Sequence, residues 1–423
     1  MANYFGWKDT FIIGWDEQTT YDVKSGSPSF QWMEASSPDI SLNLSTEELS
    51  LSKSSDFETS KRVVGAQSGS ITFSAPLASM ASSYDPASPT LALGPVGKLL
   101  IDFFGSSSAN ATDGSTTLLA IASSGSDGDT WVTDSGDLKP GNCYATGNTD
   151  GALSSINWVK ASSSSEHTLF ESSTAIPADD DVVFPTTTLH STAAVNEPPS
   201  RTFKLAGEEA DHALLLIGAK PQRLSISLEA GKTPMAEFTY TFTAYEYDRT
   251  GGGLAAVGAF QRVPPLMGSK GARLWIEGTA GASAQEDGTC GVVNANLTIE
   301  CETVPIPCHA GKQGVSDVLT RRRSATFACT IPWSNDWVES GQTENKFNLA
   351  LEAGTQMSVS LQCGTKAGAF FGVLIPAAYV VAPAELTDSN GLAAFSVTFA
   401  PGPYTGDTGS EPATDSIIRL ALG

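Results

Sequence analysis

The sequence is poor in basic residues, histidine and cysteine. Its 423 residues include 24 Lys and Arg against 46 Asp and Glu, which gives a formal net charge of −22. A negative field of this size repels phosphate and disfavours a protein that adheres to nucleic acid. The first residues, MANYFGWKDTF, lack the basic start, apolar core and small-residue cleavage site of a secretory signal, so we expect none.

Residues that carry chemistry are scarce and poorly grouped. There is no P-loop, dinucleotide-binding glycine motif, nucleophile elbow or H-E-x-x-H motif. Cys301, Cys308 and His309 lie close in sequence, but their spacing fits no common zinc pattern. Asp179–Asp181 is better explained as a solvated acidic loop than as a calcium site. The sequence therefore predicts no catalytic residue, no cofactor and no metal site.

The cysteines give no framework of disulfides. Six are present, without a C-x-x-C pair, and we expect them to be reduced, buried thiols. One uncharged apolar stretch, Ala367–Ala384, is long enough to test as a membrane helix. Gly368, Gly372, Pro376 and Pro383 divide it into lengths typical of strands, so it predicts two buried strands and no membrane span.

What the sequence does contain is alternation with period two, which is typical of half-buried antiparallel strands. The clearest sets are Leu42/Leu44, Leu49/Leu51, Ile71/Phe73/Ala75, Leu224/Ile226/Leu228, Phe238/Tyr240/Phe242, Leu297/Ile299 and Phe395/Val397/Phe399. Helical periodicity is weak, with short candidates only at Gly97–Phe104 and Ala206–Ala213. The pattern predicts an all-β protein with minor α content.

An internal repeat runs through these strands. Leu42, Leu44, Leu49 and Leu51 match Leu297, Ile299, Val304 and Ile306 at an offset of 255, and a later block around Phe238 matches Phe395 at an offset of 157. Because the offset falls from 255 to 157, the first copy should carry about 98 extra residues between these two blocks. We expect two copies of one β-domain: a first at residues 1–104 plus 200–250, and a second at 251–423.

The extra residues fall at 105–199, a region rich in Ser, Thr, Gly and Asp. A disordered linker is one interpretation. Short apolar groups that include Trp131, Tyr144 and Trp158 favour a small inserted β-domain instead. The runs Ser106–Ser115 and His190–Ser200 are typical of flexible stems.

Basic residues gather on two segments at equivalent places in the repeat. The first carries Lys53, Lys61 and Arg62, and the second carries Lys312, Arg321, Arg322 and Arg323. Solvated loop tips are the simpler explanation. Alternatively, each basic loop docks on the acidic surface of a neighbouring copy, and such a head-to-tail contact would build rings or filaments.

The chain resembles the major tail tube proteins of long-tailed (siphovirus-type) bacteriophages. The likeness lies in LSTEELSLSKSSDFETSKRVVGAQSGSITFSAP at Leu44–Pro76, GPVGKLLIDFFG at Gly94–Gly105, the stretch Pro199–Phe242, the Leu-Ile-Pro strand at Leu374–Pro376 and the late Phe-Ser-Val-Thr-Phe strand. The segment Leu138–Gly147, LKPGNCYATG, is similar to a small β-barrel that some relatives carry.

The resemblance implies duplicated β-sandwich or barrel domains, in a structural virion protein that self-assembles into stacked rings around a channel for DNA ejection. A duplicated chain would need three copies for a pseudo-sixfold ring, whereas single-domain relatives form hexamers. The family's long loop toward the next ring would map onto Lys53–Gly65 and Cys308–Arg323, and the insert would face outward.

Other parts of the tail and the place of assembly follow from the same resemblance. The partners implied are further copies of the chain and other phage tail proteins, namely the tape measure, terminator and distal tail proteins. Viral DNA would pass through the lumen without specific binding, no membrane would be involved, and assembly would take place in the host cytoplasm. The alternatives are another virion β-protein (tail terminator, baseplate or decoration protein) or a carbohydrate-binding β-sandwich.

Overall fold

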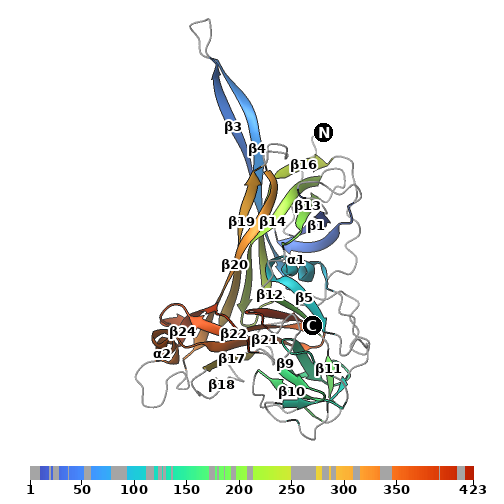
Figure 1. Cartoon of the computed structure of the whole chain (residues 1–423), viewed down its shortest axis with the longest axis vertical. Helices are drawn as coiled ribbons and strands as arrows, with labels where there is room; N and C mark the ends of the chain where they lie inside the picture. The colour runs from blue at the N-terminus through green and yellow to red at the C-terminus, as the bar shows by residue number, and fades with distance from the viewer. Residues whose placement is uncertain are drawn as a thin grey trace.

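The computed structural model describes most of the chain in a mainly β architecture (Figure 1). The described residues are 10–18, 21, 28–36, 38–51, 59–77, 93–110, 119–121, 126, 130–134, 137–170, 177–178, 181–184, 186–191, 197–206, 213–248, 273–278, 285–286, 292–307, 315–333, 345–389, 391–406 and 415–423. The prediction of an all-β protein with minor α content is confirmed.

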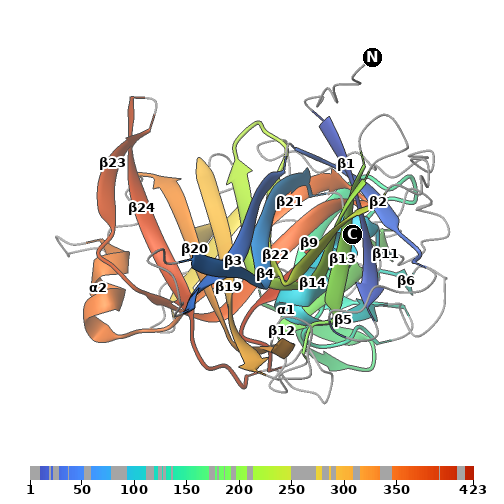
Figure 2. The same ribbon diagram turned by 90° about the horizontal axis from the view of Figure 1, so that it is seen from above.

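One long antiparallel sheet runs through the molecule and contains strands from distant parts of the sequence. In order of pairing its strands are β3 (Asp39–Leu51), β4 (Thr59–Pro76), β15 (Met235–Phe242), β14 (Ala213–Glu229), β19 (Asn294–Pro307), β20 (Val315–Pro332), β24 (Leu392–Pro401) and β23 (Glu385–Ser389). Figure 2 shows β23 and β24 at one end of the molecule, beside β20 and β19. We call this the long sheet.

The two faces of the long sheet follow the alternation of the sequence. One face buries large apolar side chains such as Phe73, Phe238 and Phe327 in a continuous core. The other face carries exposed or half-buried polar side chains, because successive residues of a strand point to opposite sides. The strands predicted from period-two patterns are therefore observed.

We call residues 1–104 together with 200–250 the first half, and residues 251–423 the second half. In the first half, a second layer covers the apolar face of the long sheet. Its elements are β1 (Thr10–Gln18), β2 (Gln31–Ser36), β13 (Ser200–Ala206), β16 (Ala244–Asp248) and α1 (Pro95–Phe104). Strand β14 belongs to both layers: its first part pairs with β13 and β16, and its last part pairs with β15 and β19. Helix α1 confirms the helix expected at Gly97–Phe104, whereas most of Ala206–Ala213 lies outside the described residues.

The second half has a corresponding layer. It consists of β17 (Arg273–Gly278), β18 (Gln285–Glu286), β21 (Met357–Lys366), β22 (Ala369–Val380), β25 (Arg419–Leu422) and α2 (Lys346–Ala353). The apolar stretch Ala367–Ala384 contains one buried strand, β22, so the expectation of two strands there was wrong. None of the described helices is long and apolar enough to cross a membrane.

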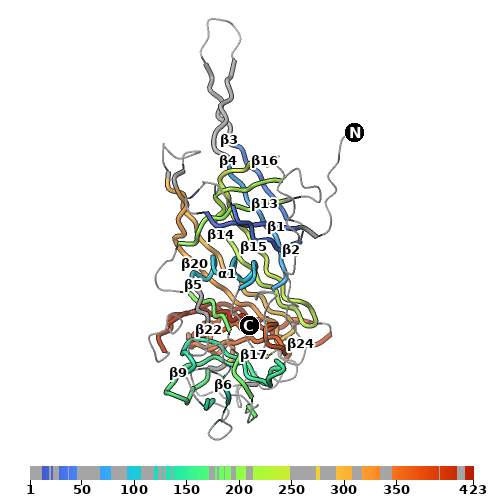
Figure 3. Tube along the Cα trace, turned by 90° about the vertical axis from the view of Figure 1, so that its right-hand side faces the viewer, coloured from blue at the N-terminus to red at the C-terminus, as the bar shows by residue number. Residues whose placement is uncertain are grey.

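The two halves share one order of pairing. In the first half β4 pairs with β15, β15 with β14, β14 with β13 and β16, and β13 with β1. In the second half β20 pairs with β24, β24 with β22, β22 with β21 and β25, and β21 with β17. Figure 3 separates the upper layers around β13 and β16 from the lower part around β17 and β22.

Residues 119–184 contain a sheet of their own, which we call the insert barrel. Its strands are β6 (Leu119–Ala120), β11 (Val182–Phe184), β8 (Cys143–Gly147), β9 (Leu153–Ser163), β10 (Glu166–Leu169) and β7 (Thr130–Val132) in order of pairing. A bridge between Ile121 and Thr133 joins the two ends of this sheet. Trp131, Tyr144 and Val159 fill its interior, so these described residues are not a disordered linker.

The segments that lead into and out of the insert barrel are also strands. These are β5 (Gly105–Asn110) and β12 (Thr186–Ser191), which pair with each other along their whole length. The expectation of flexible stems was therefore wrong for Ser106–Asn110 and for His190–Ser191. A run of small hydroxylated side chains suggested a linker, but here β12 completes its backbone hydrogen bonds with both β5 and β25.

Candidate assembly surfaces

Two hairpins extend the long sheet at one end, and we call them arm 1 and arm 2. Arm 1 is the outer part of β3 and β4, which pair as far as Leu51 and Thr59 and project well beyond the other strands (Figure 1). Arm 2 is the corresponding part of β19 and β20 beyond Glu302. Both arms contain a register shift, between Leu44 and Thr46 in arm 1 and between Glu302 and Thr303 in arm 2.

The basic residues expected on two loops lie mainly on strands. Lys61 pairs with Leu49 and Arg62 with Glu48 in arm 1, so both are strand residues, while Lys53 lies outside the described residues. In the second half Arg321, Arg322 and Arg323 belong to β20, and Lys312 lies outside the described residues. The expected loops Lys53–Gly65 and Cys308–Arg323 are therefore shorter than the sequence suggested.

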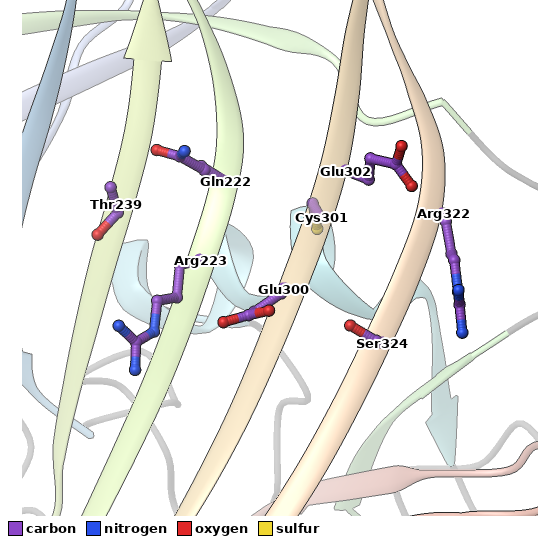
Figure 4. A pocket seen from close by; sticks show the side chains of 8 residues that line it. All are labelled: Gln222, Arg223, Thr239, Glu300, Cys301, Glu302, Arg322 and Ser324. Carbon is purple, nitrogen blue, oxygen red and sulfur yellow. The ribbon is translucent and has the colours of Figure 1, made fainter.

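The three arginines of β20 point to different places. Glu302 pairs with Arg322 and Thr303 pairs with Thr320, which leaves Arg321 as the extra residue of a β-bulge. Arg321 Nη1 lies 3.5 Å from Glu302 Oε1 at an exposed site. Arg322 lines a shallow hollow on the polar face, shared with Arg223, Glu300 and Glu302 (Figure 4).

Arg323 lies on the opposite side of the strand and contacts the interior. A Cβ atom at Gly105, where φ is 100°, would lie 3.0 Å from Arg323 Nη1, so the guanidinium approaches the end of helix α1. A cation is favourable there, because the carboxyl end of a helix carries a partial negative charge. Burial raises the pKa of the nearby Cys301 thiol to about 11, although Arg323 opposes this shift.

Arg321 and Arg322 are exposed, whereas Arg323 packs against the interior, so the three arginines should differ in their effect on stability. We expect Arg321→Ala combined with Arg322→Ala to change the free energy of unfolding by less than about 1 kcal/mol, because exposed ion pairs contribute little. Arg323→Ala should cost roughly 1–3 kcal/mol, since it removes a half-buried cation that hydrogen-bonds to Cys301. Thermal unfolding of the three chains measures both effects. Equal losses for the double variant and Arg323→Ala would contradict this division.

The long sheet ends at two strand edges for which the described strands provide no partner. On one side β3 pairs only with β4, and on the other β23 pairs only with β24, among the strands described. Both edges carry exposed apolar side chains, Leu42 and Leu44 at β3 and Leu386 and Leu392 at the β23–β24 hairpin. Strand β23 carries Glu385 and Asp388, and β3 contains a register shift, but exposed leucines lie at both edges beside backbone groups that no described strand pairs. These edges are therefore candidates for pairing with another chain.

Arm 2 adds a third apolar surface. Val304 and Leu319 face each other across the hairpin, and both are exposed, as is Ile306. An apolar strip on a projecting hairpin is costly in water and is typical of a contact surface.

The polar face of the long sheet is dominated by hydroxyl and amide groups. Its uncharged members include Ser41, Ser70, Thr72, Ser74, Ser225, Ser227, Thr239, Thr241, Asn294, Asn296, Thr298, Ser324, Thr326 and Thr330. The charged residues of this face include Glu237, Glu300 and Arg223. Arg223 lies directly opposite Glu300 across the β14–β19 pair. Among the residues whose side chains the structure describes, this face is therefore polar and carries no basic stripe.

Within the described part of the chain, no three His, Cys, Asp or Glu side chains gather as a metal site requires. The described cysteines, Cys143, Cys301, Cys329 and Cys363, are free and buried. Burial raises the pKa of both Cys329 and Cys363 to about 12, so their thiols stay neutral. Cys308 and His309 lie outside the described residues.

Open sheet edges, projecting hairpins and a continuous polar face define a β-sheet protein whose surfaces suit assembly. Residues 12–413 match the family of phage tail tube proteins, and the chain belongs to this family. It is a structural protein of the phage tail, which places it in the virion, and the resemblance found in the sequence is confirmed. No curated protein matches the chain.

Proposed function

We propose that three copies of the chain close into a ring and that the rings stack into the tail tube, through which viral DNA passes during ejection. The observation that carries this proposal is the pairing of β14 with β19, from Arg223–Glu300 to Glu229–Asn294. In the pairing order of the long sheet, it joins the last strand contributed by the first half to the first strand contributed by the second half. The equivalent junction between copies would run from β23 of one chain to β3 of the next, because β23 pairs with β24 as the last part of β14 pairs with β15, and β3 pairs with β4 as β19 pairs with β20. This junction would continue the long sheet around a ring.

The shared pairing order of the two halves supports three copies per ring. We propose that the halves are duplicated domains, at residues 1–104 with 200–250 and at 251–423, so that three chains supply six equivalent units. Closed rings form when a head-to-tail contact repeats with a rotation that closes. Six copies per ring would require twice as many units around the channel.

The polar face is the surface that we assign to the lumen. DNA binding depends chiefly on Lys and Arg contacts to phosphate, and this face offers Arg223 and Arg322 beside Glu300 and Glu302. A hydroxyl-rich surface of this kind keeps its hydration and gives a polyanion few fixed contacts. Passage without specific binding is the result we expect.

The two arms are the surfaces that we assign to contacts between rings. Arm 1 carries Lys61 and Arg62, and arm 2 carries Arg321 and Arg322 near its base. Docking of these bases, with Lys53 and Lys312, on the acidic surface of the next ring would set the register of stacking. At the tube ends the same surfaces would meet other tail proteins, with assembly in the host cytoplasm.

Electron microscopy of the purified protein, with its solution mass measured in parallel, tests this function. Hollow tubes or stacked rings with three chains per ring are the expected result. Rings with six chains would overturn the stoichiometry. Closed single rings that never stack would point to a tail terminator, and a glycan-binding monomer would point to a carbohydrate-binding protein.

A further inference from the structure

The insert barrel leaves the first half after α1 and returns to it at β13, yet it packs against the second half. From the insert barrel, Cys143, Ala145, Ile156, Trp158, Val182 and Phe184 enter one buried apolar cluster. From the second half the same cluster contains Ala367, Phe370, Leu374 and Ala421. Figure 1 shows β9 and β11 beside β21, β22 and the C-terminus. Buried apolar contact of this extent fixes the barrel in place.

The strands on either side of the insert barrel belong to the sheet of the second half. Strand β12 pairs with β25 from Thr187–Leu422 to His190–Arg419, and β25 pairs with β22. Strand β5 extends this sheet by pairing with β12. A segment that interrupts the first half therefore completes the sheet of the second.

The returning end of the insert joins both halves through one carboxylate. Lys220 of β14, which is almost fully buried, donates to Glu197 Oε1 at 3.3 Å and to the carbonyl oxygen of Pro198 at 2.8 Å. The amide nitrogen of Thr320 in β20 donates to both oxygens of Glu197, at 3.0 and 3.1 Å. Thr320 adjoins the bulge at Arg321, so Glu197 satisfies a backbone group at the base of arm 2.

The outgoing end is tied to β20 as well. Gly105, the first residue of β5, lies against the guanidinium of Arg323. Farther along, the guanidinium of Arg419 in β25 lies 5.5 Å from the ring centre of Phe170 and 5.7 Å from that of Tyr404. Because Phe170 belongs to the insert and also lies 6.1 Å from the Tyr404 ring, this cluster again joins the insert to the second half.

We propose that residues 105–199 act as an internal brace that fixes the two halves of the chain at one angle. Between the halves the long sheet is continuous through the β14–β19 pair, and twist between neighbouring strands varies over tens of degrees. A closed ring requires one defined angle between neighbouring units, and here the two halves of each chain are such neighbours. This role in ring closure rests on the proposed function, but the brace itself is a property of the single chain. A decorative insert would need neither the shared apolar cluster nor the Glu197 contacts.

Hydrogen exchange of the unassembled chain tests the brace with two variants. The first replaces residues 111–185 by an Asn-Gly turn between Asn110 and Thr186, which are cross-strand partners, and so keeps β5 and β12. The second is Glu197→Ala, with Glu229→Ala as matched control, because the exposed side chain of Glu229 forms an ion pair with Lys232, three residues along the chain. Both test variants should exchange about tenfold faster than the parent at β19, β20 and β25, and the control should not.

Unchanged exchange in Glu197→Ala would overturn the brace, and so would unchanged exchange in a folded chain without the barrel. If the barrel deletion does not fold, the Glu197 variant decides alone. If the parent protein never forms rings, the proposed function fails while the exchange data still judge the brace. If the parent forms rings and the variants exchange like the parent, the brace fails alone.

Discussion

The double variant Leu386→Lys with Leu392→Lys, at the β23–β24 hairpin, is expected to abolish the proposed ring formation while the chain stays folded. The two leucines are 61% and 66% exposed, so replacing them removes little buried surface from the single chain. Charged residues, lysine above all, are how natural edge strands avoid pairing with other chains. Electron microscopy and sedimentation of the variant measure the loss. Tyr247→Lys, at an exposed site on β16, is the control and should still form rings.

The opposite edge allows a sharper version of this experiment. Leu42→Lys combined with Leu44→Lys blocks β3, and this variant alone should also remain monomeric. A mixture of the two blocked chains retains one usable junction, between β23 of one and β3 of the other, so it should form dimers and nothing larger. Rings of normal diameter from either variant would show that these edges are not the junction between copies.

Loss of Asp102 or Arg201 is expected to destabilise the first half by roughly 3–5 kcal/mol, because either change leaves one buried charge without its partner. Arg201 donates from Nη2 to Asp102 Oδ1 at 2.7 Å and from Nε to Oδ2 at 3.1 Å. The hydroxyl of Tyr240 donates to Asp102 Oδ2 at 3.0 Å. The network therefore joins α1 to β13 and β15. Burial raises the pKa of Asp102, and the two donors oppose that shift.

Chemical denaturation of Asp102→Ala and Arg201→Ala gives the size of this effect. Glu17→Gln is the matched control, because Glu17 contacts the same guanidinium at 3.1 Å from a side chain that is 63% exposed, and it should cost less than about 1 kcal/mol. The pair Asp102→Leu with Arg201→Met should recover most of the loss, since removing both charges leaves none unpaired. A loss in Asp102→Ala no larger than in the control would refute the argument.

Much of the architecture could be predicted from alternation alone. Sets such as Phe238/Tyr240/Phe242 and Phe395/Val397/Phe399 predicted strands with one buried face, and both form such strands in the long sheet. This works because side chains alternate strictly along a strand, so the buried face is written into local sequence.

The candidate assembly surfaces were predicted less well. The run Arg321–Arg323 suggested one basic loop tip, but it lies within a strand at a bulge, where the same alternation sends Arg322 and Arg323 to opposite sides. The free edges at β3 and β23 were not predicted, because an edge depends on which strands pair. Leu42 and Leu44 were predicted as one face of a half-buried strand, and Leu386 and Leu392 belonged to none of the predicted strands.

The sequence by itself determined the all-β class, most strands of the long sheet and membership of the phage tail tube family. Tertiary structure alone decided that the insert barrel packs on the second half and that Glu197 joins Lys220 to Thr320. Trp158 and Phe184 were recognisable as apolar, but their partners Phe370 and Leu374 lie far away in sequence. The hydrophobic effect is non-directional, so an apolar side chain does not specify which other apolar side chains it will contact. Those contacts are decided only when the whole chain packs.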